Sequence, residues 1–175
     1  MSNKGLLGLL LGGVVFLLLL TGASLLLPKR GLAEDGRQVM GVSNLKQLSL
    51  GAMIYMADYD DRTPPVLNWN NNLYPYLKNN HVFGSGLKGA GVRDFAYNRN
   101  LAEIESNSVL EQERTPLFFR SFRIGTDLNG EKADLANDSD GSLISFLDSA
   151  TKRQPTQKEI DSYNWTPKIN KARKP

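Results

Sequence analysis

Hydrophobic residues follow three different patterns along this chain, and each pattern predicts a different kind of element. An uncharged apolar run fills residues 5–27. Apolar residues then recur at three- and four-residue spacing over residues 39–59, which predicts a helix with an apolar face. Farther along, short aromatic and aliphatic segments at residues 94–98, 116–122 and 142–147 predict strands.

The run at residues 5–27 is long enough to cross a membrane, because about 20 apolar residues in a helix span a hydrocarbon core of roughly 30 Å. A secretory signal peptide has a shorter apolar core of roughly 7–15 residues. The length therefore favours an uncleaved anchor, with a cleaved signal as the alternative. Lys4 on one side and Lys29 and Arg30 on the other leave the orientation open.

Glycines in this run allow membrane helices to approach one another closely. Gly8 and Gly12 form a pair of small residues four positions apart, which is typical of contacts between membrane helices. The ordinary composition of a membrane helix is the alternative explanation. The residues expected to insert and pack are Gly5, Gly8, Gly12, Gly13, Phe16 and Gly22.

The second helical segment carries apolar residues on much of its circumference. One face holds Leu45, Leu48, Ala52, Tyr55 and Met56, and Leu50, Met53, Ile54 and Ala57 widen it. This width predicts a helix that is buried over much of its surface. We expect four of its residues to join the helix to the rest of the domain: Leu45, Leu48, Met53 and Tyr55.

The order of these elements predicts an α+β fold in three parts. An N-terminal leader and transmembrane helix would occupy residues 1–28 and continue into a long helix. That helix would pack on a small antiparallel β-sheet in an extracytoplasmic head at residues 29–150. Residues 151–175 would form a basic tail, because they carry seven Lys and Arg residues against Glu159 and Asp161.

Composition narrows the chemistry that the chain could perform. The formal net charge is only +3, which does not suggest a polyanion-binding surface, and the chain has no cysteine. It has one histidine, His81, so no second histidine is present to complete a zinc site or a proton relay. Asp138 and Asp140 are weak calcium candidates, although Ala136 and Leu147 break the EF-hand pattern. We predict no cofactor and no enzymatic activity, with a calcium loop of another type left open.

Several segments, taken in order, resemble type II secretion pseudopilin-like (type IV pilin-like) proteins. They read SNLKQL at 43–48, YMADYDD at 55–61, LYPYLKN at 73–79, FAYNRNL at 95–101 and ISFLDS at 144–149. The chain departs from the family where Leu10 occupies the position of a buried Glu near the mature N-terminus. Asp138 and Ser149 likewise replace a late His and Gly of the family pattern.

The resemblance implies a pilin-like fold, with the N-terminus in the cytoplasm and the head in the periplasm, outside the inner membrane of a bacterium. It implies a single-pass structural protein that assembles through its N-terminal helix with other membrane-embedded protein subunits. The alternative is an accessory structural subunit of a larger membrane complex that reuses a pilin-like scaffold. A membrane-anchored enzyme or ligand-binding module using the Asp-rich loop is a further rival. Membrane lipid is an expected partner, whereas nucleic acid and a small-molecule substrate are not.

Overall fold

The structure is a computed structural model that describes residues 30–89, 91–137 and 141–170. The chain divides into two compact units, residues 1–34 and 35–175. Every strand in the described ranges belongs to the second unit, which contains the surfaces considered below.

A long helix, α2, dominates the domain and spans Arg30–Asp58. Its apolar residues at three- and four-residue spacing bury one face, and the side chains of Leu45 and Leu48 are inaccessible to solvent. The helix ends in a turn where Asp60 and Asp61 adopt left-handed backbone conformations, with φ angles of 52° and 59°. Pro64 and Pro65 follow and prevent helical continuation.

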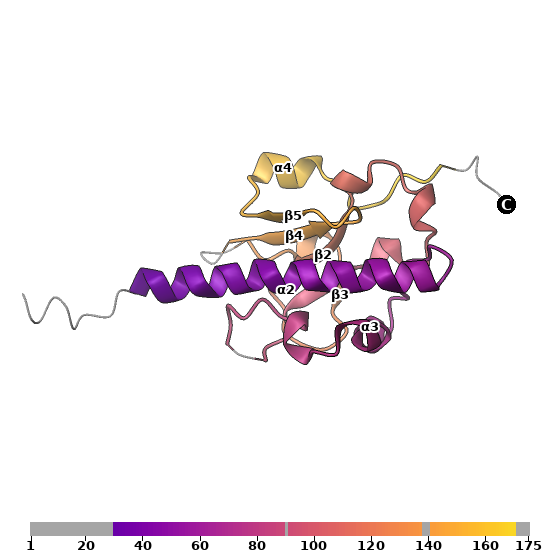
Figure 1. The fold of residues 1–175 in the computed structure, drawn as a ribbon. Helices are drawn as coiled ribbons and strands as arrows, with labels where there is room; N and C mark the ends of the chain where they lie inside the picture. The colour runs from indigo at the N-terminus through magenta and orange to yellow at the C-terminus, as the bar shows by residue number, and fades with distance from the viewer. Residues whose placement is uncertain (1–29, 90, 138–140, 171–175) are drawn as a thin grey trace, which may run out of the picture. The chain divides into compact units, whose positions relative to one another are not determined.

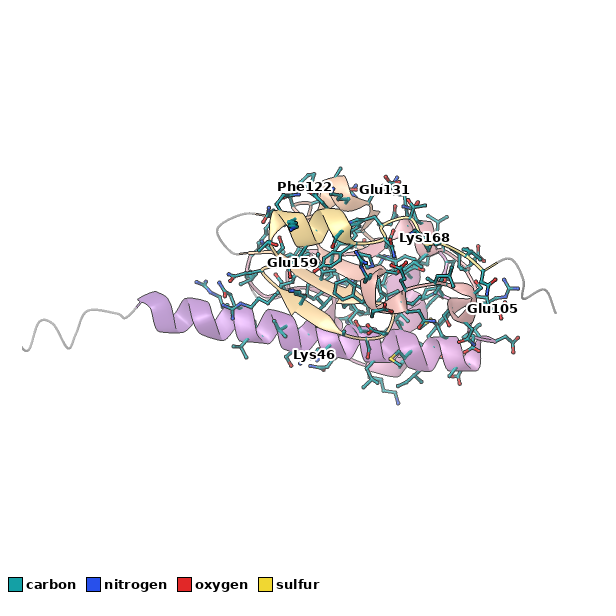
Figure 2. The ribbon with its side chains drawn as sticks, turned by 90° about the horizontal axis from the view of Figure 1, so that it is seen from above. Lys46, Glu105, Phe122, Glu131, Glu159 and Lys168 are labelled. Atoms are coloured by element: carbon teal, nitrogen blue, oxygen red, sulfur yellow. The ribbon has the colours of Figure 1, made fainter. Side chains whose placement is uncertain are left out.

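Shorter helices surround the sheet. Helix α3 spans Trp69–Leu77 and α4 spans Gln157–Ser162. A capping box between Thr156 and Glu159 begins α4, and Glu159 lies in this helix in Figure 2. The 3₁₀ turns are η1 (Asn80–Phe83), η2 (Arg99–Leu101), η3 (Ser106–Ser108), η4 (Gln112–Arg114) and η5 (Lys132–Asp134).

The sheet has five strands in the order β3-β1-β2-β4-β5. They span Phe95–Asn98 (β1), Pro116–Arg120 (β2), Asn129–Gly130 (β3), Leu143–Phe146 (β4) and Thr151–Arg153 (β5). The α+β class is as predicted, but the predicted antiparallel sheet is wrong, because β3 pairs parallel to β1. The connection at residues 121–128 carries the chain to the far edge of β1, so β3 enters in the same direction as β1.

The two faces of the sheet bury separate cores. Helix α2 and helix α3 cover one face, where their apolar residues pack on Phe95, Tyr97 and Phe118. Helix α4 covers the other face and packs on Phe119 and neighbouring residues of β1 and β4. Figure 1 shows α2 and α4 separated by β4 and β5. Residues 151–170, which were expected in the basic tail, therefore contain a strand and a helix of the domain.

The structure does not support the predicted membrane topology. Among residues 30–89, 91–137 and 141–170, no helix is both long enough and apolar enough to cross a membrane. The long helix α2 carries charged residues along its length, including Arg37, Lys46 and Asp58. Within the described residues, this finding contradicts the predicted fold with an N-terminal transmembrane helix and the predicted single-pass, inner-membrane location with a periplasmic head. The predicted anchor at residues 5–27 lies outside the described residues.

Close packing of α2 at Gly41 provides a test of this arrangement. A Cβ atom at position 41 would lie 2.9 Å from both Leu143 Cδ1 and the Ser85 carbonyl oxygen, whereas a Cβ atom at Gly36 would meet nothing within 4 Å. We expect Gly41→Ala to lower the free energy of unfolding by about 1–3 kcal/mol, because the helix must move away from the sheet.

Gly36→Ala is the matched control in the same helix. It should raise the free energy of unfolding by about 0.5–1 kcal/mol, because alanine favours a helix more than glycine does. Chemical denaturation measures both variants. Equal effects of the two substitutions would contradict the close approach at Gly41.

Candidate functional site

The polar clusters singled out from the sequence do not form a recognisable reaction centre in the described residues. In that part of the chain, no group of three His, Asp or Glu side chains could hold a metal ion. The calcium candidates Asp138 and Asp140 lie outside the described residues. The Asp127 carboxylate makes a contact within the domain, since its Oδ1 accepts a hydrogen bond from the Asn70 backbone N–H at 2.9 Å.

The four residues expected to join the long helix to the rest of the domain divide between two environments. Leu45, Leu48 and Tyr55 lie in the core shared with the sheet and α3. Met53 is 41 % exposed and lies outside this core. The membrane-packing residues form the other predicted set and lie outside the described residues: Gly5, Gly8, Gly12, Gly13, Phe16 and Gly22.

The face of α2 turned away from the sheet exposes apolar side chains. Leu50 is 57 % exposed, Ile54 is 44 % exposed, and Met53 and Ala57 lie beside them. We call these four residues the outer stripe. Their spacing of three and four residues places them along one side of the helix. We predicted that these residues would be buried with the rest of α2. This prediction is wrong, because the domain by itself leaves them exposed.

The outer stripe continues a longer seam along the helix. Positions 39, 43, 46, 50, 53 and 57 alternate spacings of four and three residues, the pattern at which one helix packs along another. Val39 is exposed at the beginning of this seam. Lys46, exposed near the middle of α2, places a single positive charge between Val39 and Leu50 (Figure 2).

Two shallow hollows lie on either side of the outer stripe. One has a volume of about 170 Å³ and lies between α2 and α3, with Leu50, Ile54 and Leu77 in its wall. Gly51 lets Leu77 pack closely against α2 beside this hollow, because a Cβ atom there would lie 2.8 Å from Leu77 Cδ2. The other hollow, of about 190 Å³, has Met53 and Ala57 in its wall.

A tyrosine and a carboxylate fix the end of the first hollow. The Tyr76 hydroxyl donates a hydrogen bond to Asp58 Oδ2 at 3.0 Å, which connects α3 with the last residue of α2. Partial burial and the neighbouring Asp58 carboxylate raise the pKa of Tyr76 to about 12. Tyr55 stacks on Tyr59 with ring centroids 4.2 Å apart, and burial raises the pKa of Tyr55 as well.

The outer stripe is an exposed apolar surface on a supported helix. The stripe is apolar, has a rim of polar groups and lies on a helix whose opposite face is fixed in the core. Sequence reasoning missed it because periodicity reports that a helix face is apolar without reporting what covers it. The excess width of the apolar face was the available signal, since a single sheet face covers only part of a helix.

No family model, curated protein or solved structure matches this chain. The comparisons therefore give no support to the predicted pseudopilin resemblance or to a role in type II secretion.

The hydrogen bond between Tyr76 and Asp58 predicts a specific pH dependence. Because the folded-state pKa of Tyr76 is raised from 10.0 to about 12, its contribution to stability is complete below pH 10 and is lost as the pH rises toward 12. Asp58→Asn removes the negative charge and should move the Tyr76 pKa back toward 10.

NMR of labelled tyrosine ring carbons measures this titration residue by residue. Asp60→Asn is the matched control, since Asp60 is exposed in the following turn and is not among the groups that raise the Tyr76 pKa. A Tyr76 titration that Asp58→Asn leaves unchanged would show that this contact does not hold the two helices together.

Proposed function

We propose that this chain is a structural, non-catalytic subunit that assembles with other protein subunits through the exposed face of α2. The observation that carries the proposal is the outer stripe, an apolar seam on a long helix that the described residues of the domain leave uncovered. Its occupant would be an apolar helix of another subunit. Stated more generally, the proposal is that the chain is a structural subunit of a larger protein complex.

Helix packing explains why this partner suits the surface. A partner helix with apolar residues at alternating three- and four-residue spacing would insert them between Leu50, Met53 and Ile54. The hollows on either side of the stripe give room for larger side chains. Lys46 would favour a partner with an acidic residue at the matching position, because an unpaired charge in a seam opposes association.

The size of the stripe supports a moderate affinity. Complete burial of a Leu, Ile or Met side chain is worth about 1.5–3 kcal/mol. Because Leu50, Met53 and Ile54 are each about half exposed, a partner that covers all three would gain about 3 kcal/mol from them. This gain corresponds to roughly a hundredfold in affinity.

Photo-cross-linking in the cells that produce the protein tests this proposal. A photoreactive residue would replace Leu50 in the full chain, and in the control it would replace Ile124, which is 61 % exposed between β2 and β3. We expect discrete protein adducts from position 50 whose cross-linked peptides map to an apolar helix. Ile54→Lys should abolish them, because the added charge opposes burial of the stripe.

Leu67→Lys, at a residue 74 % exposed outside α2, provides a matched substitution that should leave the adducts unchanged. Circular dichroism would establish that all variants keep the same helix content and unfolding midpoint. Adducts of equal abundance from positions 50 and 124, or adducts that survive Ile54→Lys, would contradict assembly through this face.

A further inference from the structure

A polar cavity lies at the other side of α3, apart from the outer stripe. Its volume is about 240 Å³, enough for one small organic molecule. Its wall comes from α3, from η1 and from Arg93, which lies two residues before β1. The lining residues are Asn70, Asn71, Tyr74, Asn80, Phe83 and Arg93.

Arg93 gives the cavity a single positive charge that is held in position. Its Cζ atom lies 5.5 Å from the centre of the Phe83 ring, and its Nη2 donates a hydrogen bond to Asn80 Oδ1 at 3.0 Å. In the part of the chain that the structure describes, no carboxylate forms an ion pair with Arg93. Among the residues described, no Asp or Glu lines the cavity.

The neighbouring amide strengthens the preference for an anion. Because Asn80 Oδ1 accepts from Arg93, the Asn80 amide nitrogen remains to donate a hydrogen bond outward. A guanidinium and an amide nitrogen together form a donor pair suited to a carboxylate. Stacking on Phe83 orders the guanidinium before any ligand arrives, which reduces the entropy cost of binding.

Asn70 adds an unmatched acceptor to the same wall. Its side chain is 4 % exposed, and its Oδ1 has no hydrogen-bond partner among the described residues. A buried polar atom without a partner is costly and calls for an explanation. Because Oδ1 is enclosed by the protein, a hydroxyl group of a bound molecule would supply the missing donor only after the Asn70 side chain turns toward the cavity.

We infer that this cavity binds a small hydroxylated carboxylate of the size of a single sugar acid. The carboxylate would lie against Arg93 and the Asn80 amide, and the carbon skeleton would face the rings of Tyr74 and Phe83. A hydroxyl would donate to Asn70 Oδ1 once that side chain turns toward the cavity. This site goes beyond the proposed assembly role and does not depend on it, because no residue of the outer stripe lines the cavity.

Isothermal titration of the full chain with three probes tests the ligand class. Glucuronate carries both the carboxylate and the hydroxyl groups, glucose lacks the carboxylate, and acetate lacks the hydroxyl groups. We expect glucuronate to bind at least about tenfold more tightly than either of the others, because each lost contact involves a charged or buried group. Failure of glucuronate to bind at millimolar concentration, or equal binding of glucose, would overturn the inference.

Three variants locate the binding. Arg93→Gln should weaken glucuronate binding by about tenfold or more, whereas Arg114→Gln should not, since Arg114 is an exposed arginine in η4 that pairs with Glu111. Arg93→Lys keeps the charge but loses the planar fork, so an intermediate loss is expected.

NMR shift changes on adding glucuronate to the unmodified chain give a readout that does not depend on any variant folding. They should centre on Asn71, Tyr74 and Asn80. Shifts elsewhere, or binding that Arg93→Gln leaves unchanged, would overturn the assignment of the ligand to this cavity.

Discussion

The packing of Trp69 is the contact on which both functional surfaces depend. Its ring lies 5.1 Å from Phe118 of β2 and 5.8 Å from Phe83 of η1, measured between ring centroids. Its indole Nε1 donates to the Leu128 carbonyl oxygen at 2.9 Å, beside the start of β3. One buried aromatic side chain thereby positions a helix, a turn and the crossing to the parallel strand. Asn70 follows Trp69 directly, so the same packing fixes the wall of the polar cavity.

The two surfaces differ in chemistry although α3 borders both. Toward α2, its residues Tyr76 and Leu77 bound an apolar hollow beside the outer stripe. Toward η1 and Arg93, its asparagines bound a polar cavity. Both lie on elements whose inner faces are buried in the core, so each surface is formed before any partner arrives. The two proposals thus use different residues of one short helix.

The sequence allowed much of the fold to be predicted but little of either surface. Three strands fall within segments of aromatic and aliphatic residues, and α2 covers nearly all of the predicted helix. Strand β3 was missed because Asn129–Gly130 carries no alternating pattern and gains its pairing only from the nearby chain crossing. The exposure of Leu50 and the meeting of Asn70 with Arg93 depend on tertiary packing. The width of the apolar face of α2 was a partial signal for the first feature, whereas no local pattern of residues encodes the second.

The edges of the sheet restrict how copies or partners could associate. At one edge β3 has two residues, and at the other β5 has three, including exposed Lys152 and Arg153. Strands this short offer few free backbone groups, and the basic side chains repel an incoming strand of like charge. Association by adding strands is therefore disfavoured at both ends of the sheet. A chain built this way can expose an apolar helix with a lower risk that the contact grows into a β-aggregate.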